Sequence, residues 1–109
     1  MKEEIKVVHL KSNGQSIETW ISLLDGEVVG HIYMECQLEN KIKFLDAWVH
    51  PDHRRKGIYR KLWETRWEYV NDNYKGYLTY AWCKENSLPL LIEKGFSIGE
   101  VVTYVEKKI

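Results

Sequence analysis

The sequence of 109 residues lacks several features that mark large classes of protein. Its longest apolar runs, such as Trp20–Leu24, are far shorter than the roughly 20 residues that a membrane-spanning helix needs. Its two cysteines, Cys36 and Cys83, stand in no CxxC or other metal-ligand spacing, which excludes a disulfide framework and a zinc site. These absences predict a soluble cytoplasmic protein with no membrane partner.

The chain also lacks an excess of charge of either sign. Sixteen Lys and Arg residues balance sixteen Asp and Glu residues, so the formal net charge is zero. This excludes the broadly basic surface of a general nucleic-acid-binding protein, and no nucleic-acid partner is expected. Proline is scarce, with two residues, and no repeat or low-complexity tract divides the sequence. We therefore expect residues 1–109 to form a single domain, with a core supplied by 44% hydrophobic residues.

The first half of the sequence has the β-branched and aromatic content of strands. Four such segments span residues 4–10, 16–24, 27–38 and 42–49. Asn13-Gly14 and Asp25-Gly26 separate the first three segments, and both dipeptides favour tight hairpin turns because they tolerate positive φ. Residues 39–41 provide a third turn. The sequence therefore predicts an antiparallel meander.

The second half changes to helical spacing after Pro51. Residues 54–71 are predicted to form an amphipathic helix, because residues that are apolar or aromatic, with one arginine among them, recur three and four apart: Ile58, Leu62, Trp63, Arg66, Trp67 and Val70. A strand at 77–82, a short helix at 86–94 and closing strand material at 96–107 follow. A β-α-β unit implies a parallel strand pair. The predicted fold class is α/β (α+β), a mixed, mostly antiparallel sheet with a central parallel β-α-β unit.

Residues 54–61 carry five basic side chains in eight positions and no acid. They lie at the start of the predicted helix, where free backbone N–H groups already favour an anion. Gly57 lacks a Cβ and so lets a phosphate approach the backbone closely. The segment is neither a Walker A loop nor a GxGxxG fingerprint. It is either an anion-binding helix start or simply a solvated basic one.

Residues 49–62 resemble the acyl-CoA-binding signature of the GNAT superfamily of N-acetyltransferases, whose core is Q/R-x-x-G-x-G/A. Three further segments are similar in the expected order: residues 25–30, Asn86, and residues 93–96. The resemblance extends from residue 17 to about residue 105. It implies that strands four and five separate, and that the pantetheine arm of the co-substrate acetyl-CoA lies between them.

The resemblance also implies which residues bind the cofactor. Backbone groups of Trp48 and Val49 would bind pantetheine, and Asn86 would hold the cofactor near its thioester. The diphosphate would lie on the loop and helix start formed by Arg54, Arg55, Lys56, Gly57, Ile58 and Tyr59. No metal site is predicted, since His50 and His53 are typical of a solvated turn.

The sequence departs from the family pattern at its catalytic positions. Tyr59 replaces the usual Gly or Ala, and Leu91 stands where many relatives carry a tyrosine acid. Lys43, Leu45 and Ala81 occupy the positions of other family bases. The remaining catalytic candidates are Asp46 as base, and Tyr80 or Cys83 as donor to the sulfur. Each also has an ordinary structural interpretation, as a surface carboxylate, a core or surface tyrosine and a small buried thiol.

The resemblance implies an N-acetyltransferase that moves an acetyl group from acetyl-CoA to a primary amine by direct attack. Typical members place two helices between their first two strands, and only a short turn separates Leu10 from Ser16 here. The expected acceptor is a small-molecule amine or a protein lysine or N-terminus. An open acceptor side suits a protein lysine or N-terminus, or a site completed by a second subunit in a homodimer. The alternatives are a non-catalytic acyl-CoA-binding or protein-interaction module on the same fold and, less favoured by the neutral charge, a small anion-binding domain.

Overall fold

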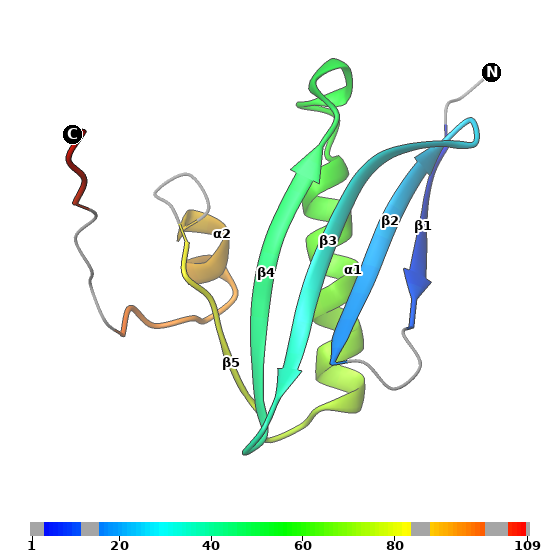
Figure 1. Cartoon of the computed structure of the whole chain (residues 1–109). Coiled ribbons are helices and arrows are strands. Elements are labelled where there is room, and N and C mark those ends of the chain that lie inside the picture. Colours follow the sequence, from blue (N-terminus) through cyan, green and yellow to red (C-terminus); the bar gives the residue numbers. More distant parts are fainter. Residues whose placement is uncertain (1–3, 12–15, 84–87, 100–104, 109) are drawn as a thin grey trace.

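The computed structural model describes residues 4–11, 16–83, 88–99 and 105–108, and for Asp46 the backbone alone. Five strands form one sheet in sequence order: β1 (Ile5–Leu10), β2 (Ile17–Leu24), β3 (Glu27–Gln37), β4 (Lys41–Val49) and β5 (Leu78–Tyr80). The pairs from β1 to β4 are antiparallel, and β4 pairs with β5 in parallel (Figure 1). The predicted fold class is therefore confirmed.

Tight turns join the middle strands where the sequence predicts them. Asp25 and Gly26 have φ values of 52° and 81°, and Glu39 and Asn40 have φ values of 63° and 56°. Positive φ at two successive central residues is the geometry that matches the right-handed twist of the flanking strands. The predicted turn at Asn13-Gly14 lies outside the described residues.

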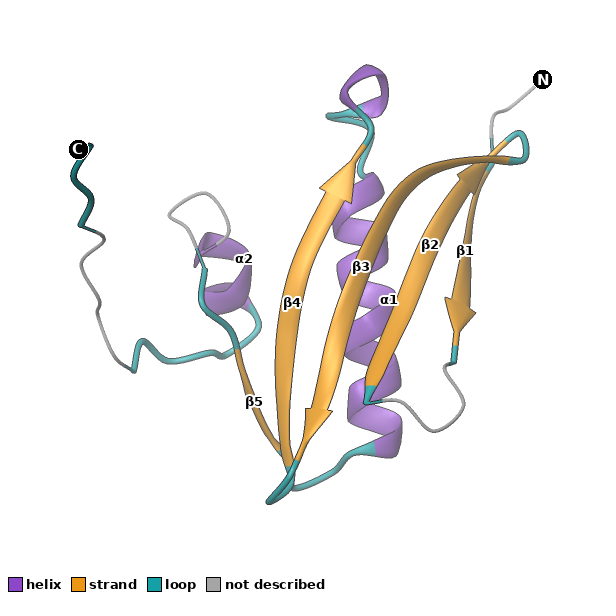
Figure 2. Ribbon diagram, viewed as in Figure 1, coloured by secondary structure: helices purple, strands orange, loops and turns teal. Residues whose placement is uncertain are grey.

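One long helix covers one face of this sheet. α1 (Ile58–Asn73) lies behind β1–β4 in Figure 2, and its buried residues are Ile58, Leu62, Trp63, Arg66 and Val70. The predicted start at residue 54 is wrong, because Arg55 and Gly57 have left-handed φ values of 65° and 78° that an α-helix cannot contain. A short 3₁₀ turn, η1 (Pro51–His53), precedes this loop. The second predicted helix is α2 (Leu88–Glu93).

The closing strand that the sequence predicts over residues 96–107 is wrong for the described part of that segment. Residues 96–99 and 105–108 are irregular. The physical reason lies in the packing of Phe96, whose N–H donates to Leu91 O at 3.0 Å. Its ring lies 5.3 Å from the ring of Trp67 on α1. The chain is therefore held against the helices after Gly95 instead of pairing with β5.

β1 and β2 are joined without room for additional helices. Leu10 pairs with Thr19, so only residues 11–16 connect the two strands. Six residues make less than two turns of α-helix, which rules out the pair of helices that typical relatives carry here. On the face opposite α1, no other element of the described chain covers β1–β4 (Figure 1).

Candidate functional site

The central feature of the site is a gap between β4 and β5. The two strands pair over three positions, Lys41 with Leu78, Ile42 with Thr79 and Lys43 with Tyr80. β5 then ends, while β4 continues to Val49, and the two segments diverge (Figure 1). Among the described residues, β4 has no strand partner on this side beyond Lys43. Its outer edge therefore presents backbone groups to the gap.

The end of β4 directs Val49 toward the gap. The His50 N–H donates to Val29 O at 2.8 Å, which bonds β4 to β3 at that residue. In an antiparallel ladder such bonding residues alternate, so Trp48 faces β3 with its backbone and Val49 faces away from it. The Val49 carbonyl accepts instead from Arg54 Nε at 3.2 Å. This contact ties the basic loop to the upper end of the gap.

The loop between β4 and α1 has the geometry of an anion site. Gly57 is the N-cap of α1, and no side chain caps the helix. The first bond of the helix runs from Lys61 N–H to Gly57 O at 3.0 Å, so the N–H groups of the three residues before Lys61 have no intrahelical acceptor. A Cβ built on Gly57 meets nothing within 4 Å, which leaves open space over the backbone.

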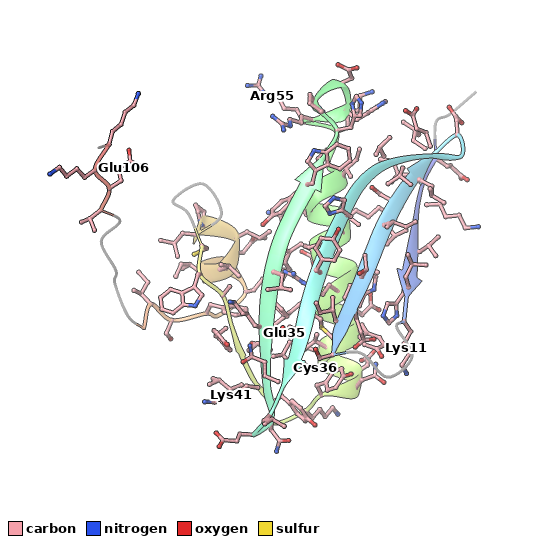
Figure 3. The ribbon with its side chains drawn as sticks, viewed as in Figure 1. Lys11, Glu35, Cys36, Lys41, Arg55 and Glu106 are labelled. Atoms are coloured by element: carbon pink, nitrogen blue, oxygen red, sulfur yellow. The ribbon has the colours of Figure 1, made fainter. Side chains whose placement is uncertain are left out.

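Exposed cations surround this helix start. Arg54, Arg55 and Lys56 are all exposed, and Arg55 projects from the tip of the loop (Figure 3). Within the described part of the chain, neither Arg55 nor Lys56 has a hydrogen-bond or ion-pair partner. Cations at a helix N-terminus are unfavourable unless an anion is bound there. The residues present therefore fit the diphosphate of acetyl-CoA.

Close packing fixes the start of α1 against the sheet. Ile58 is buried, and a Cβ on Gly30 of β3 would lie 2.8 Å from Ser22 Oγ, 3.0 Å from Trp48 O and 3.2 Å from Ile58 Cγ2. Gly30 is therefore required for this approach of helix and sheet. Tyr59 packs partly buried against the core. Its side chain is therefore held at the core and leaves the backbone of the loop accessible to a diphosphate.

A β-bulge interrupts β4 where it leaves β5. Ile32 pairs with Ala47 and Met34 pairs with Phe44, so Tyr33 of β3 faces two residues of β4, Leu45 and Asp46. A bulge leaves ladder groups unpaired and bends the strand. Here it lies directly above the last β4–β5 pair, so it marks the base of the gap.

A buried arginine of α1 contacts this bulge. Arg66 is 2% exposed, and its Nη1 donates to Tyr33 O at 2.7 Å and more weakly to Leu45 O at 3.5 Å. The guanidinium carbon lies 3.8 Å from the centre of the Phe44 ring. Burial lowers the pKa of Arg66 to about 9. Sequence reasoning missed this role, although an arginine at a core position of an amphipathic helix was its signal.

The catalytic candidates are not joined to one another in the described residues. The Tyr80 hydroxyl donates to Gln37 Oε1 at 2.6 Å, and Cys83 is exposed without a bond to Tyr80. The side chain of Asp46 and the whole of Asn86 lie outside the described residues. Leu91, at the position of the usual family acid, is buried in the core.

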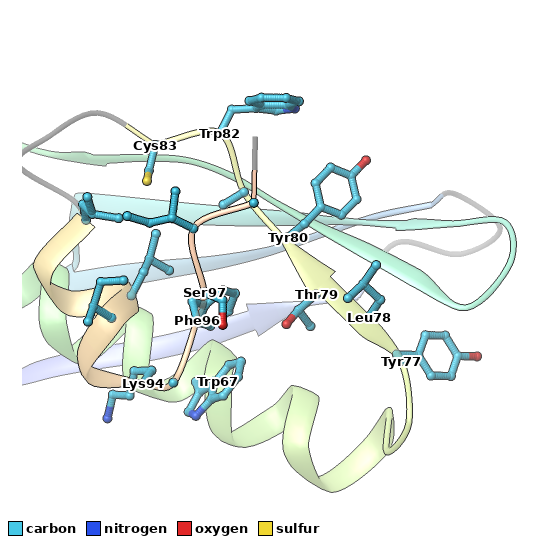
Figure 4. Close-up of a pocket in the computed structure, with 17 residues that line it drawn as sticks. Trp67, Tyr77, Leu78, Thr79, Tyr80, Trp82, Cys83, Lys94, Phe96 and Ser97 are labelled. Carbon is cyan, nitrogen blue, oxygen red and sulfur yellow. The ribbon is translucent and has the colours of Figure 1, made fainter. Parts of the chain in front are cut away.

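A separate pocket of about 890 Å³ lies between β5, α2 and residues 94–99 (Figure 4). Its lining includes Tyr80 and Cys83 but no residue of β4, so it is distinct from the gap between β4 and β5. Figure 4 shows Thr79 directed toward Trp67 and the ring of Tyr80 on the opposite side of β5. Tyr80 and Cys83 therefore border the pocket as well as the end of β5.

Cys36, the other cysteine, belongs to a partly buried polar cluster at the other end of the sheet. Cys36 Sγ lies 3.7 Å from Tyr74 Oη and 3.9 Å from Glu18 Oε2, and Glu18 accepts from His9 Nε2 at 2.9 Å. Burial raises the pKa of the Cys36 thiol. Figure 3 places Cys36 far from Arg55 along the sheet. Cys36 is thus a poor nucleophile, remote from the candidate site.

The separated β4 and β5 strands and the uncapped basic helix start define the class of acyl-CoA-binding acetyltransferase folds. A family model confirms this assignment: residues 15–98 match the acetyltransferase (GNAT) domain. The chain belongs to the GNAT family and is by class an acetyl-CoA-dependent acyltransferase.

Solved structures give the same fold at low sequence identity. An acetyltransferase of Trypanosoma brucei is 20% identical, with a TM-score of 0.67 over 84% of this chain and 70% of that one. An aminoglycoside N-acetyltransferase in complex with CoA is 12% identical, with a TM-score of 0.67 over 100% of this chain and 98% of that one. A ribosomal-protein-alanine N-acetyltransferase of Brucella melitensis is 16% identical, with a TM-score of 0.65 over 95% and 99%.

Curated proteins give no significant match. In the described residues, no helix has the length and apolar character required to cross a membrane.

Proposed function

We propose that this protein is an N-acetyltransferase that binds acetyl-CoA between β4 and β5 and transfers the acetyl group directly to a primary amine. The observation that carries the proposal is the gap itself, which opens after three parallel pairs and ends at the basic start of α1. Amide groups of pantetheine would replace the ladder bonds that β4 lacks on this side. The diphosphate would bind the free N–H groups and cations of the loop.

Direct transfer requires three things: a neutral amine, a donor to the developing oxyanion and a proton for the sulfur. We assign the oxyanion contact to the Val49 N–H, because its backbone faces the gap. Asp46 is our candidate for receiving the amine proton through water. Tyr80 and Cys83, at the end of β5, are the candidates for protonating the departing thiolate.

The acceptor is proposed from the open face of the sheet. Only residues 11–16 connect β1 to β2, so this side carries no helical roof between those strands. Structural relatives include an aminoglycoside N-acetyltransferase and a ribosomal-protein-alanine N-acetyltransferase, that is, enzymes named for a small and a macromolecular amine. An open face favours a protein lysine or N-terminus, or an acceptor site completed by a second copy of the chain.

A second candidate function is a non-catalytic acyl-CoA-binding module. The buried Leu91 at the position of the usual acid favours it, as does the Tyr80 hydroxyl that already donates to Gln37. This alternative shares the cofactor site and differs only in the chemistry.

Two measurements on the full chain separate these functions. CoA at 100 times its dissociation constant should add about 2.7 kcal/mol of stability and raise the melting temperature. Release of free thiol from acetyl-CoA, followed with polyamine, amino-acid and lysine-peptide acceptors, should then identify the enzyme. No thermal shift at millimolar CoA would contradict both functions. A shift without thiol release for any acceptor would favour the binding module.

Gly57→Val tests the placement of the cofactor, with Gly76→Val as its matched control. Both glycines have left-handed φ values, 78° and 85°, and a Cβ at either meets nothing within 4 Å. Both substitutions should therefore lose a similar stability, about 1–2 kcal/mol. Only Gly57→Val should weaken CoA binding, by about 10-fold or more, as measured by calorimetric titration. Equal CoA affinity in the two variants would reject the loop as the diphosphate site.

A further inference from the structure

Arg66 is a charged group whose burial the acetyl-transfer chemistry proposed above does not use. Among the described residues, the core of the protein contains two buried charged side chains, Arg66 at 2% and Glu18 at 5% exposure. Glu18 is bonded to His9 and Tyr74 near the far end of the sheet. Arg66 instead reaches from the middle of α1 to the backbone of β3 and β4. Arg66 therefore contacts the two strands at a place where it can affect the geometry of β4.

Both carbonyls that Arg66 contacts belong to the bulge. Tyr33 O, at 2.7 Å from Nη1, is on the residue of β3 that faces two residues of β4. Leu45 O, at 3.5 Å, is on one of those two residues. A bulge leaves such groups without their usual ladder partners, and a buried carbonyl without a partner is unfavourable. The guanidinium supplies the missing donor.

Aromatic packing holds the guanidinium in one place. Its central carbon lies 3.8 Å from the centre of the Phe44 ring and 5.4 Å from that of Trp63. Arg66 Nε is buried and has no hydrogen-bond partner in the described structure. Replacing Arg66 by an apolar side chain would leave Tyr33 O without this donor, which should lower the stability of the protein. A test of any further role of Arg66 must therefore separate turnover from stability.

The bulge that Arg66 contacts lies where β4 leaves β5. The last pair of β4 with β5 is Lys43 with Tyr80, and the bulge begins two residues later at Leu45. The free segment of β4 that borders the gap, residues 45–49, thus starts at the bulge. A shift of the bulge would move the Val49 peptide, which stands four residues beyond Leu45.

We propose that Arg66 is a positioning residue for acetyl transfer: its buried guanidinium pins the bulge of β4 and so sets the place of the Val49 peptide relative to the bound thioester. This inference rests on the proposed function. The diphosphate loop lies beyond the bulge and is fixed by Gly30, Ile58 and Arg54. The diphosphate contacts, which carry the charged part of CoA binding, therefore depend on Arg66 much less than turnover does.

The test compares Arg66→Met and Arg66→Lys with Val70→Ala, a buried apolar position one turn further along α1. Arg66→Met should lower kcat by about 10-fold to 100-fold, since small misplacements at a reacting centre have effects of that size. The dissociation constant of CoA should change by less than about 3-fold, because the loop that binds the diphosphate is fixed independently of the bulge. Arg66→Lys keeps one donor and should recover part of kcat. Val70→Ala should lose stability and keep kcat.

Amide hydrogen exchange of residues 45–49 gives a readout that does not depend on the acceptor or on turnover. In CoA-bound Arg66→Lys and Arg66→Met, these amides should exchange faster than in the wild type, while β2 exchanges as before. Unchanged kcat and unchanged exchange at 45–49 would overturn the inference. A loss of kcat in Val70→Ala equal to that in Arg66→Met would do the same. A wild-type protein that binds no CoA would reject the proposed function instead, before any variant is compared.

Discussion

The gap has two walls that are built very differently: the β4 wall, which is β4 with the strands and helix packed on it, and the β5 wall, which is β5 with α2. β4 pairs along its length with β3, within a block of four antiparallel strands packed on the 16 residues of α1. β5 has three residues, and α2, which follows it, has six. Two ion pairs, made by Glu64 and Glu93, and the ring of Phe96 attach the β5 side to α1. The contrast indicates that packing stabilises the wall assigned to the cofactor strongly and the wall that carries Tyr80 and Cys83 only weakly.

The difference has a consequence for function. An acyl-CoA site needs a fixed strand edge and helix start, because the diphosphate and pantetheine are recognised by backbone groups. Segments that must adapt to an acceptor are drawn from the weakly held parts of a fold. The β4 wall supplies the fixed strand edge and helix start, and the β5 wall is the weakly held part. We therefore expect substitutions in the two walls to separate global stability from local motion.

The largest expected effect is in the core under the β4 wall. Ile32→Ala removes a side chain that is 1% exposed between β3 and α1, and should cost about 2–5 kcal/mol in the free energy of unfolding. Leu91→Ala on α2 should cost less, because the short helix can move into the space. Urea denaturation of both variants measures the difference. An equal or larger loss for Leu91→Ala would show that the two walls are equally important for stability.

Next in size is Gly30→Ala, which places a Cβ in contact with Ser22, Trp48 and Ile58. Overpacking of this kind should cost about 1–3 kcal/mol and displace the start of α1. Ser22 Oγ is buried without a hydrogen-bond partner in the described residues, so Ser22→Ala alone should be close to neutral. The double variant Ser22→Ala/Gly30→Ala should recover part of the loss. A double variant no more stable than Gly30→Ala would place the clash at the backbone of Trp48 instead.

The two thiols give a smaller contrast that needs no change of fold. Cys83 is exposed on the β5 wall, whereas burial raises the pKa of Cys36. A raised pKa means less thiolate at a given pH, so Cys36 should be alkylated about 10-fold or more slowly than Cys83 at pH 8, and its rate should rise at higher pH. Mass spectrometry after iodoacetamide labelling, with Cys83→Ser as control, reads each site. Equal rates would show that the Cys36 cluster opens freely.

The smallest effect belongs to the ion pairs that link the walls. Arg60 Nη2 lies 3.1 Å from Glu93 Oε2, and both side chains are more than half exposed. Lys94 Nζ lies 2.6 Å from Glu64 Oε1, and here the lysine is partly buried. Exposed pairs contribute about 0–1 kcal/mol, so Arg60→Met should change the unfolding free energy by less than that. Added salt should erase the difference between variant and wild type. A loss that persists at high salt would mean that the Arg60 stem packs between α1 and α2.

The sequence predicts the β4 wall much better than the β5 wall, for physical reasons. Alternating β-branched residues and the Asp25-Gly26 turn are local signals, and they lead to the correct meander. The start of α1 is missed because residues 54–57 look helical by composition, whereas the left-handed Arg55 and Gly57 are set by the loop. The closing strand is missed because the packing of Phe96 on Trp67, a contact between distant residues, overrides local strand preference.

The candidate site follows the same division. The basic residues of the loop and Gly57 are contiguous, so the sequence marks this segment as either an anion site or a solvated basic helix start, and the family resemblance favours the anion site. The bulge of β4 and its contact with Arg66 join three elements, and no local pattern marks them apart from an arginine at an apolar position. The catalytic assignments to Asp46, Tyr80 and Cys83 stay predictions, because they depend on the placement of a bound thioester.

Amide hydrogen exchange of the full chain with and without CoA tests the central claim most directly. Saturating CoA should slow exchange in residues 47–49 and at the first turn of α1, which lie together at the upper end of the gap, and should leave the segment of residues 94–99 unchanged. Slower exchange confined to residues 94–99, beside the pocket behind β5, or no change at all, would contradict it.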